Sequence, residues 1–162
     1  MVITTLRVIH IVAGGFWAGA AILIGWFVTP TALEVGPSAG PFMQGLLKRN
    51  LTARLIGSGV VTVAAGLWLF ALRAPTFVRW QDYALTIGAL AAIVALLIGI
   101  TRQRPAGKKV QELGAAIASA GGPPTAEQGV EMQSLQAKMA GYGNVIAYLF
   151  VVALAGMALG GS

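Results

Sequence analysis

The sequence predicts an all-α protein in which four transmembrane helices form an antiparallel bundle, as one membrane domain over residues 1–162. Its composition leads to this class. Hydrophobic residues make up 57% of the chain and charged residues only 10%, whereas a soluble domain carries about a quarter charged residues. The apolar residues also fall into four blocks, each near the roughly 20 residues that a helix needs to cross the hydrocarbon core.

Each apolar block predicts one transmembrane helix. We expect these helices at about residues 2–28, 55–72, 83–101 and 142–160. The first block is too long for the apolar core of a signal peptide, so we interpret it as a retained helix. Pro30, Gly36 and Pro37 are expected to break the chain after it. Because the apolar runs lack the alternation of a membrane β-barrel, strands are not expected.

The distribution of basic residues predicts the orientation. Most of the Lys and Arg residues lie in the connection between the first two helices or between the last two: Lys48, Arg49, Arg54, Arg102, Arg104, Lys108, Lys109 and Lys138. By the positive-inside rule these two connections are cytoplasmic, and both termini lie outside. We therefore attribute the net charge of +6 to topology and expect no nucleic-acid partner.

The connection at about 102–141 is predicted to be a cytoplasmic helical hairpin that extends the third and fourth helices. Its outgoing arm carries an apolar stripe at Val110, Leu113 and Ile117, and its returning arm a second one at Met132, Leu135 and Met139. Residues 121–124, Gly-Gly-Pro-Pro, end the first arm, and Thr125 with Gln128 has the spacing of a capping box. We expect the stripes to pack on another surface, and Pro105 to kink the outgoing arm.

Small residues spaced by four mark faces on which helix backbones approach closely. Gly15 and Gly19 in the first helix have this spacing. We expect these faces to pack inside the bundle, with a homodimer face as the alternative. Trp26 and Trp80 suit the two membrane interfaces, whereas Trp17 lies near mid-membrane and must face protein.

His10 is the one position at membrane depth that could carry chemistry, because an ionisable group there is by default a functional candidate. It shares a helix face with Arg7, Gly14 and Trp17. A neutral imidazole could ligate copper or the iron of haem b, with room for the macrocycle beside Gly14 and a propionate paired by Arg7. The alternative, which we favour, is a structural histidine that hydrogen-bonds a neighbouring helix at Thr62, Asn144 or Tyr148.

The first helix resembles that of a known family. The residues that carry this likeness are Leu6, Arg7, Val8, Ile9, His10, Gly14, Gly15, Trp17, Ala18 and Gly19. They are similar to the first-helix signature of the copper-resistance D-like group of bacterial four-helix membrane proteins, whose wider relatives include membrane-bound protoporphyrinogen oxidase. The resemblance implies a multi-pass protein of the bacterial inner membrane and a haem-binding role for His10. Unlike the redox relatives, this sequence has no further membrane histidine and no Met cluster.

Two functional hypotheses follow. The chain has no Cys, and its acidic residues, Glu34, Asp82, Glu112, Glu127 and Glu131, are expected in loops or the hairpin rather than in the membrane. No proton relay or nucleophile is therefore indicated, and we do not expect an enzyme. We favour a non-catalytic subunit or scaffold of a membrane assembly, which binds another membrane protein or a second copy of the chain. The alternative is a b-haem- or copper-binding redox protein that uses His10.

Overall fold

The computed structural model describes residues 1–73 and 77–160, and all regular structure in these residues is helical. Four helices among them are long and apolar enough to cross a membrane: Val2–Val35, Leu51–Arg73, Trp80–Ser119 and Ala126–Gly160. The all-α class and the four apolar helices of the prediction are thereby confirmed. Residues 74–76, in the short connection expected to face outward, lie outside the described residues.

The first helix continues past Pro30. α1 (Val2–Leu23) runs through a π-helical turn, η1 (Ile24–Val28), into α2 (Thr29–Val35). A proline inside a helix lacks an N–H, and its ring collides with the carbonyl four residues earlier. In the π turn the Thr29 N–H bonds to the carbonyl of Ile24, five residues back, and this wider turn admits the proline ring that follows. The predicted break at Pro30 is therefore wrong, and the helix ends at Gly36, where φ is 70°.

The third helix passes Pro105 in the same way. α5 (Trp80–Ile98) leads into a second π turn, η3 (Gly99–Gln103), and then into α6 (Arg104–Ser119). The N–H of Arg104, directly before the proline, bonds to the carbonyl of Gly99. A five-residue π turn thus precedes both mid-helix prolines by one residue.

The remaining elements complete the chain, and one of them begins at a local signal that the sequence predicts. A 3-10 turn, η2 (Gly36–Ala39), and a short helix, α3 (Gly40–Lys48), lead to α4 (Leu51–Arg73). α7 (Ala126–Gly160) opens with the predicted capping box. The Gln128 N–H donates to Thr125 Oγ1 at 3.2 Å, and the Thr125 N–H donates to Gln128 Oε1 at 3.0 Å.

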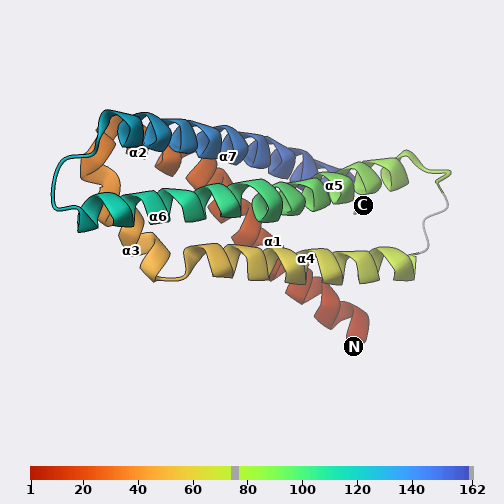
Figure 1. Cartoon of the computed structure of the whole chain (residues 1–162). Helices are drawn as coiled ribbons and strands as arrows, with labels where there is room; N and C mark the ends of the chain where they lie inside the picture. Colours follow the sequence, from red (N-terminus) through yellow and green to blue (C-terminus); the bar gives the residue numbers. More distant parts are fainter. Residues whose placement is uncertain (74–76, 161–162) are drawn as a thin grey trace.

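The helices lie roughly side by side along one long axis (Figure 1). α5 and α6 both run along α7, while α1 packs along α4 and crosses to meet α7 through η1. α2, α3 and the turn between α6 and α7 lie at one end of the molecule, and Met1 and the last turn of α7 lie toward the other.

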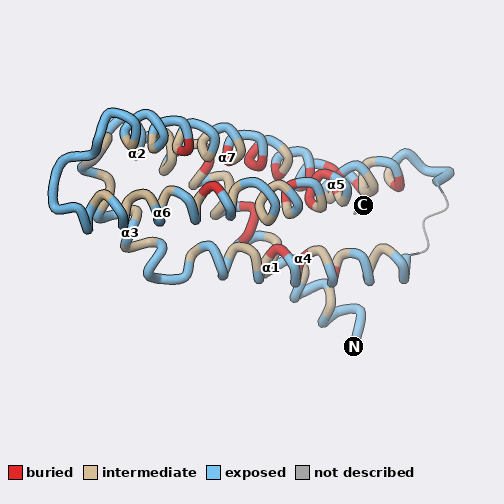
Figure 2. Tube along the Cα trace, viewed as in Figure 1, coloured by how far each residue is buried: buried red, intermediate tan, exposed pale blue. Residues whose placement is uncertain are grey.

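The core forms where α1, α5 and α7 meet, and the outward surfaces of the helices are largely exposed (Figure 2). Trp17 and Phe150 fill its centre, with ring centroids 4.6 Å apart in an edge-to-face pair. Around them the buried residues are mostly alanine, at Ala18, Ala91, Ala92, Ala95 and Ala153. Backbones touch where glycines face each other: a Cβ on Gly156 of α7 would lie 2.8 Å from the Cα of Gly88 on α5. Small residues therefore hold these helices together.

Arg73 links three helices through an ion pair and a hydrogen bond, at the end of the molecule where Met1 lies. Arg73, in the last turn of α4, pairs with Asp82 in the first turn of α5 at 3.4 Å. Its guanidinium also donates to the carbonyl of Gly160 at 2.6 Å, at the end of α7 where the helix dipole is negative. Asp82 was expected in a loop, but it lies inside α5 and only 4% of its surface is exposed.

We predict that Asp82→Asn destabilises the protein in mild detergent. The substitution leaves Arg73 without its counter-charge in a mostly covered position, and we expect a loss of roughly 2 kcal/mol, below the range for fully buried pairs because Arg73 is part-exposed. The measurement is the thermal unfolding midpoint of the purified protein. Glu112→Gln is the matched control, because the Lys108–Glu112 pair is exposed on α6. Equal midpoints for Asp82→Asn and the wild type would show that the Arg73–Asp82 ion pair does not stabilise the fold.

Candidate functional site

His10 packs against α4. Its Nδ1 lies 2.9 Å from the carbonyl oxygen of Thr62. Because a carbonyl oxygen only accepts hydrogen bonds, Nδ1 is the donor and carries a proton. The ring lies against Gly66, where an added Cβ would stand 2.7 Å from the His10 Cε1. The partner is therefore Thr62, one of the three neighbours expected for a structural histidine, although its backbone carbonyl rather than its hydroxyl makes the bond.

The other residues of the predicted haem site divide between two environments. Gly14 and Trp17 face α4 as His10 does: a Cβ on Gly14 would lie 3.1 Å from the Thr62 methyl, and Trp17 lies against Gly59. Arg7 is exposed. The space beside Gly14 that a macrocycle would need is filled by Thr62, so these residues do not fit a haem as they are placed. The geometry favours the structural histidine, and haem or copper binding by His10 stays a prediction.

Acidic, histidine and cysteine side chains do not gather anywhere in residues 1–73 and 77–160. No three of them lie close enough together there to hold a metal ion. If His10 bound a metal ion, no cluster of further acidic, histidine or cysteine ligands would assist it in these residues.

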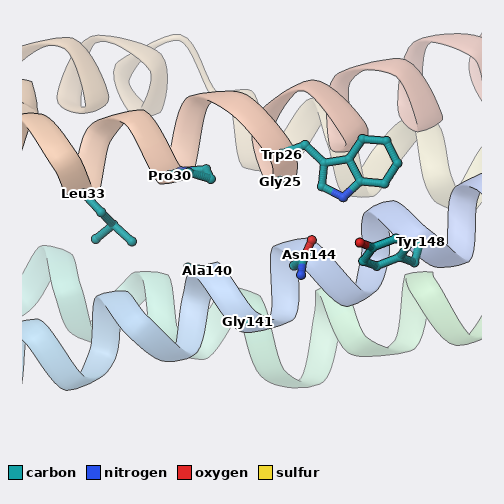
Figure 3. Close-up of a pocket in the computed structure, with 8 residues that line it drawn as sticks. All are labelled: Gly25, Trp26, Pro30, Leu33, Ala140, Gly141, Asn144 and Tyr148. Carbon is teal, nitrogen blue, oxygen red and sulfur yellow. The ribbon is translucent and has the colours of Figure 1, made fainter.

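A groove lies between η1 and α2 on one side and α7 on the other (Figure 3). Its volume is about 580 Å³, within the range of roughly 300–1,000 Å³ for small-molecule sites. No charged residue lines it; the lining residues are Gly25, Trp26, Pro30, Leu33, Ala140, Gly141, Asn144 and Tyr148. Asn144 and Tyr148, expected as partners of His10, thus lie in this groove instead.

The polar groups of the groove gather at one end. The Trp26 ring turns its nitrogen edge toward α7, where the amide of Asn144 and the hydroxyl of Tyr148 face it (Figure 3). Trp26 and Tyr148 form an edge-to-face pair with centroids 5.3 Å apart. Nevertheless, the Trp26 Nε1 is buried without a hydrogen-bond partner. An indole N–H only donates, so this atom needs an acceptor that the described residues do not supply.

A residue of each π turn lies beside Gly143 of α7. A Cβ on Gly25, in η1, would lie 2.5 Å from the carbonyl oxygen of Gly143, so the two backbones touch. Gln103, the last residue of η3, places its amide nitrogen 3.8 Å from the Cβ position of Gly143. Its Oε1 is the other buried side-chain atom without a partner among the described residues. Each π turn therefore contributes one unpaired polar atom. π turns within α-helices are frequent at functional sites.

Two glycines of α1 face away from the bundle. Gly15 and Gly19 are exposed, and an added Cβ would meet nothing within 4 Å at either residue. Ile11 and Leu23 are exposed four residues before and after them. We call the residues Ile11, Gly15, Gly19 and Leu23 the α1 outer face. The expectation that Gly15 and Gly19 pack inside the bundle is wrong, because helix rotation turns Gly14 and Trp17 inward instead.

The apolar stripe of α7 packs on glycines of α6. Met139 places its methyl group 3.6 Å from the Cβ position of Gly107, and the Met132 methyl lies 4.0 Å from that of Gly114. Leu135, between the two methionines, is buried. α6 thus supplies a surface for the α7 stripe, whereas the packing of Val110, Leu113 and Ile117 stays a prediction.

Comparison with protein families, curated proteins and solved structures finds no match to this chain. The class that its geometry defines is an all-helical protein with four helices suited to a membrane. The resemblance to the copper-resistance D-like group stays a prediction from the first-helix residues.

We predict an energetic coupling between His10 and Gly66. Gly66→Ala places a methyl group against the imidazole, and such overpacking costs about 1–3 kcal/mol. In a His10→Ala background the obstacle is gone, so the same substitution should cost little. Thermal unfolding midpoints of the four proteins measure the difference.

Gly57→Ala controls for the intrinsic effect of replacing a helical glycine, since Gly57 is exposed with open space around it. It should be neutral or stabilising, because alanine is the better helix former by about 1 kcal/mol. If Gly66→Ala costs the same with and without His10, the packing described for this pair is incorrect.

Proposed function

We propose that this protein is a non-catalytic membrane subunit or scaffold that binds the transmembrane helix of another subunit through the α1 outer face. The observation that carries the proposal is the open space at Gly15 and Gly19. Lipid tails gain nothing from a glycine, and a glycine inside a helix costs about 1 kcal/mol relative to alanine. A second helix, in contrast, can approach a pair of glycines spaced by four until the backbones touch.

The use of glycines inside the bundle supports this interpretation. Gly59, Gly66, Gly88 and Gly156 all have neighbours within 3.0 Å of an added Cβ. This chain thus packs glycines against other helices throughout its interior. Gly15 and Gly19 have the spacing for the same contact, and large exposed residues, Ile11 and Leu23, flank them on the same face. A partner helix would bury all four.

We further propose that the four helices cross the bilayer of a bacterial inner membrane as an antiparallel bundle, with the 102–141 hairpin in the cytoplasm and both termini outside. The position of the basic residues supports this orientation. So does the spacing of charges along the third helix, where Asp82 and Arg102 are separated by about 30 Å at the α-helical rise, the thickness of the hydrocarbon core.

The scaffold and haem hypotheses predict different absorption spectra. We expect the purified protein to show no Soret band, because Thr62 occupies the space beside Gly14 that a macrocycle would need. The measurement is an ultraviolet and visible spectrum of protein purified in mild detergent, with His10→Ala alongside. A Soret band that disappears in His10→Ala would establish the haem alternative.

A photo-crosslinking amino acid at Ile11 tests the α1 outer face in native membranes. We expect one discrete protein adduct, and its mass distinguishes a second copy of the chain from a different subunit. Gly15→Ile with Gly19→Ile should abolish the adduct, because the added side chains hold the partner helix away. These changes have open space around them, so the thermal midpoint should not fall.

Ala64→Leu is the matched control for that experiment. Ala64 is exposed on α4, and its neighbours four residues away, Val60 and Trp68, are large. The substitution adds apolar bulk on a different surface and should leave the adduct intact. The proposal is overturned if position 11 yields no protein adduct, or if the adduct persists in the Gly15→Ile, Gly19→Ile protein.

A further inference from the structure

The charged residues of the third helix place the groove between η1, α2 and α7 at one boundary of the hydrocarbon core proposed above. Arg102 and Arg104 are the first charged residues after the apolar run of α5. Gln103, between them, lies beside Gly143, and the next residue of α7 is Asn144 in the groove. The Trp26–Tyr148 pair is therefore at the depth where aromatic side chains collect in membranes.

The chemistry of the lining selects an uncharged molecule with an acceptor oxygen. The Trp26 N–H is a buried donor without a partner, and leaving such a group unpaired is unfavourable. The Asn144 amide and the Tyr148 hydroxyl face the same space (Figure 3). An acceptor oxygen entering between these three groups would satisfy the indole. The Trp26 Nε1 is itself covered, so a neighbouring side chain has to shift before an oxygen can reach it. Tyr148 is 60% exposed and Asn144 is also exposed, so a shift of either is not opposed by close packing on its outer side.

The other end of the groove distinguishes between classes of lipid. From Trp26 toward the hairpin end the walls are Pro30, Leu33, Ala140 and Gly141, all apolar. A phospholipid held by an ester oxygen at Trp26 would place its phosphate here, where no cation lines the groove and Glu34 follows Leu33 in the chain. An uncharged flat ring with carbonyl oxygens suits these walls.

We propose that this groove binds the ring of a membrane quinone. One quinone carbonyl accepts a hydrogen bond from the Trp26 N–H, and the ring lies over the open floor at Gly141. The apolar tail leaves past Tyr148 into the bilayer. The site is separate from the α1 outer face, so it stands or falls independently of the helix-binding proposal.

Titration of the purified protein with decylubiquinone, a short-chain quinone, tests the site through quenching of tryptophan fluorescence. We expect saturable quenching in the wild type. Gly141→Leu should abolish the saturable component, because Gly141 lines the groove and its added side chain would occupy open space there. Trp26→Phe keeps an aromatic ring but removes the donor, and quinone carried through purification, quantified by chromatography after solvent extraction, should fall about tenfold.

Gly57→Leu and Trp80→Phe are the matched controls. Gly57 is an exposed glycine with open space on α4, and Trp80 is exposed at the start of α5, away from the groove. Both variants should bind the quinone as the wild type does, and all variants should elute at the wild-type position in gel filtration. Non-saturable quenching that is equal in the wild type and Gly141→Leu would overturn the proposal. Co-purification of a phospholipid in place of a quinone, lost in Gly141→Leu, would also overturn it.

Discussion

Contact between helix backbones at glycine and alanine is the interaction on which the rest of this structure depends. Within lipid no hydrophobic force pushes apolar helices together, so association relies on close packing. α5 and α7 meet at Gly88 and Gly156 closely enough that neither position could accept a Cβ without a shift. This contact sets the height of α7 relative to α5, and with it the level at which Gly143 meets the two π turns.

The π turns explain how long continuous helices coexist with prolines. Pro30 and Pro105 each follow a turn in which one hydrogen bond spans five residues instead of four. Because that turn is wider, it accommodates the proline and the helix continues toward the hairpin end. The same turns carry Trp26 and Gln103, whose buried polar atoms lack partners. The π turns therefore both carry the helix past the proline and hold the side chains with unpaired polar atoms.

The sequence alone was sufficient for those features that depend on local chemistry. The four apolar runs predicted the four long helices, and the capping box of Thr125 and Gln128 predicted the start of α7. Features that depend on rotation or on distant neighbours were not accessible. Gly14 and Gly15 are adjacent and identical in type, yet one faces Thr62 and the other faces outward. Nor does the spacing around His10 reveal that its partner is a backbone carbonyl, since every residue type supplies one.

The glycines of α1 and α4 separate into two groups once their surroundings are compared. Those that face inward receive a defined group: the Thr62 methyl at Gly14, the Trp17 ring at Gly59 and the His10 ring at Gly66. α1 and α4 thus pack by placing side chains of one helix against glycines of the other. His10 is one of these side chains, and it also hydrogen-bonds α4. Gly15 and Gly19 leave the same kind of space on the outer side of α1, where the described residues provide nothing to fill it. Gly57 of α4 is also open, but no second glycine lies four residues from it. The two groups therefore differ in whether a neighbouring group fills the space beside the glycine, and the partner helix that we propose would fill it at Gly15 and Gly19.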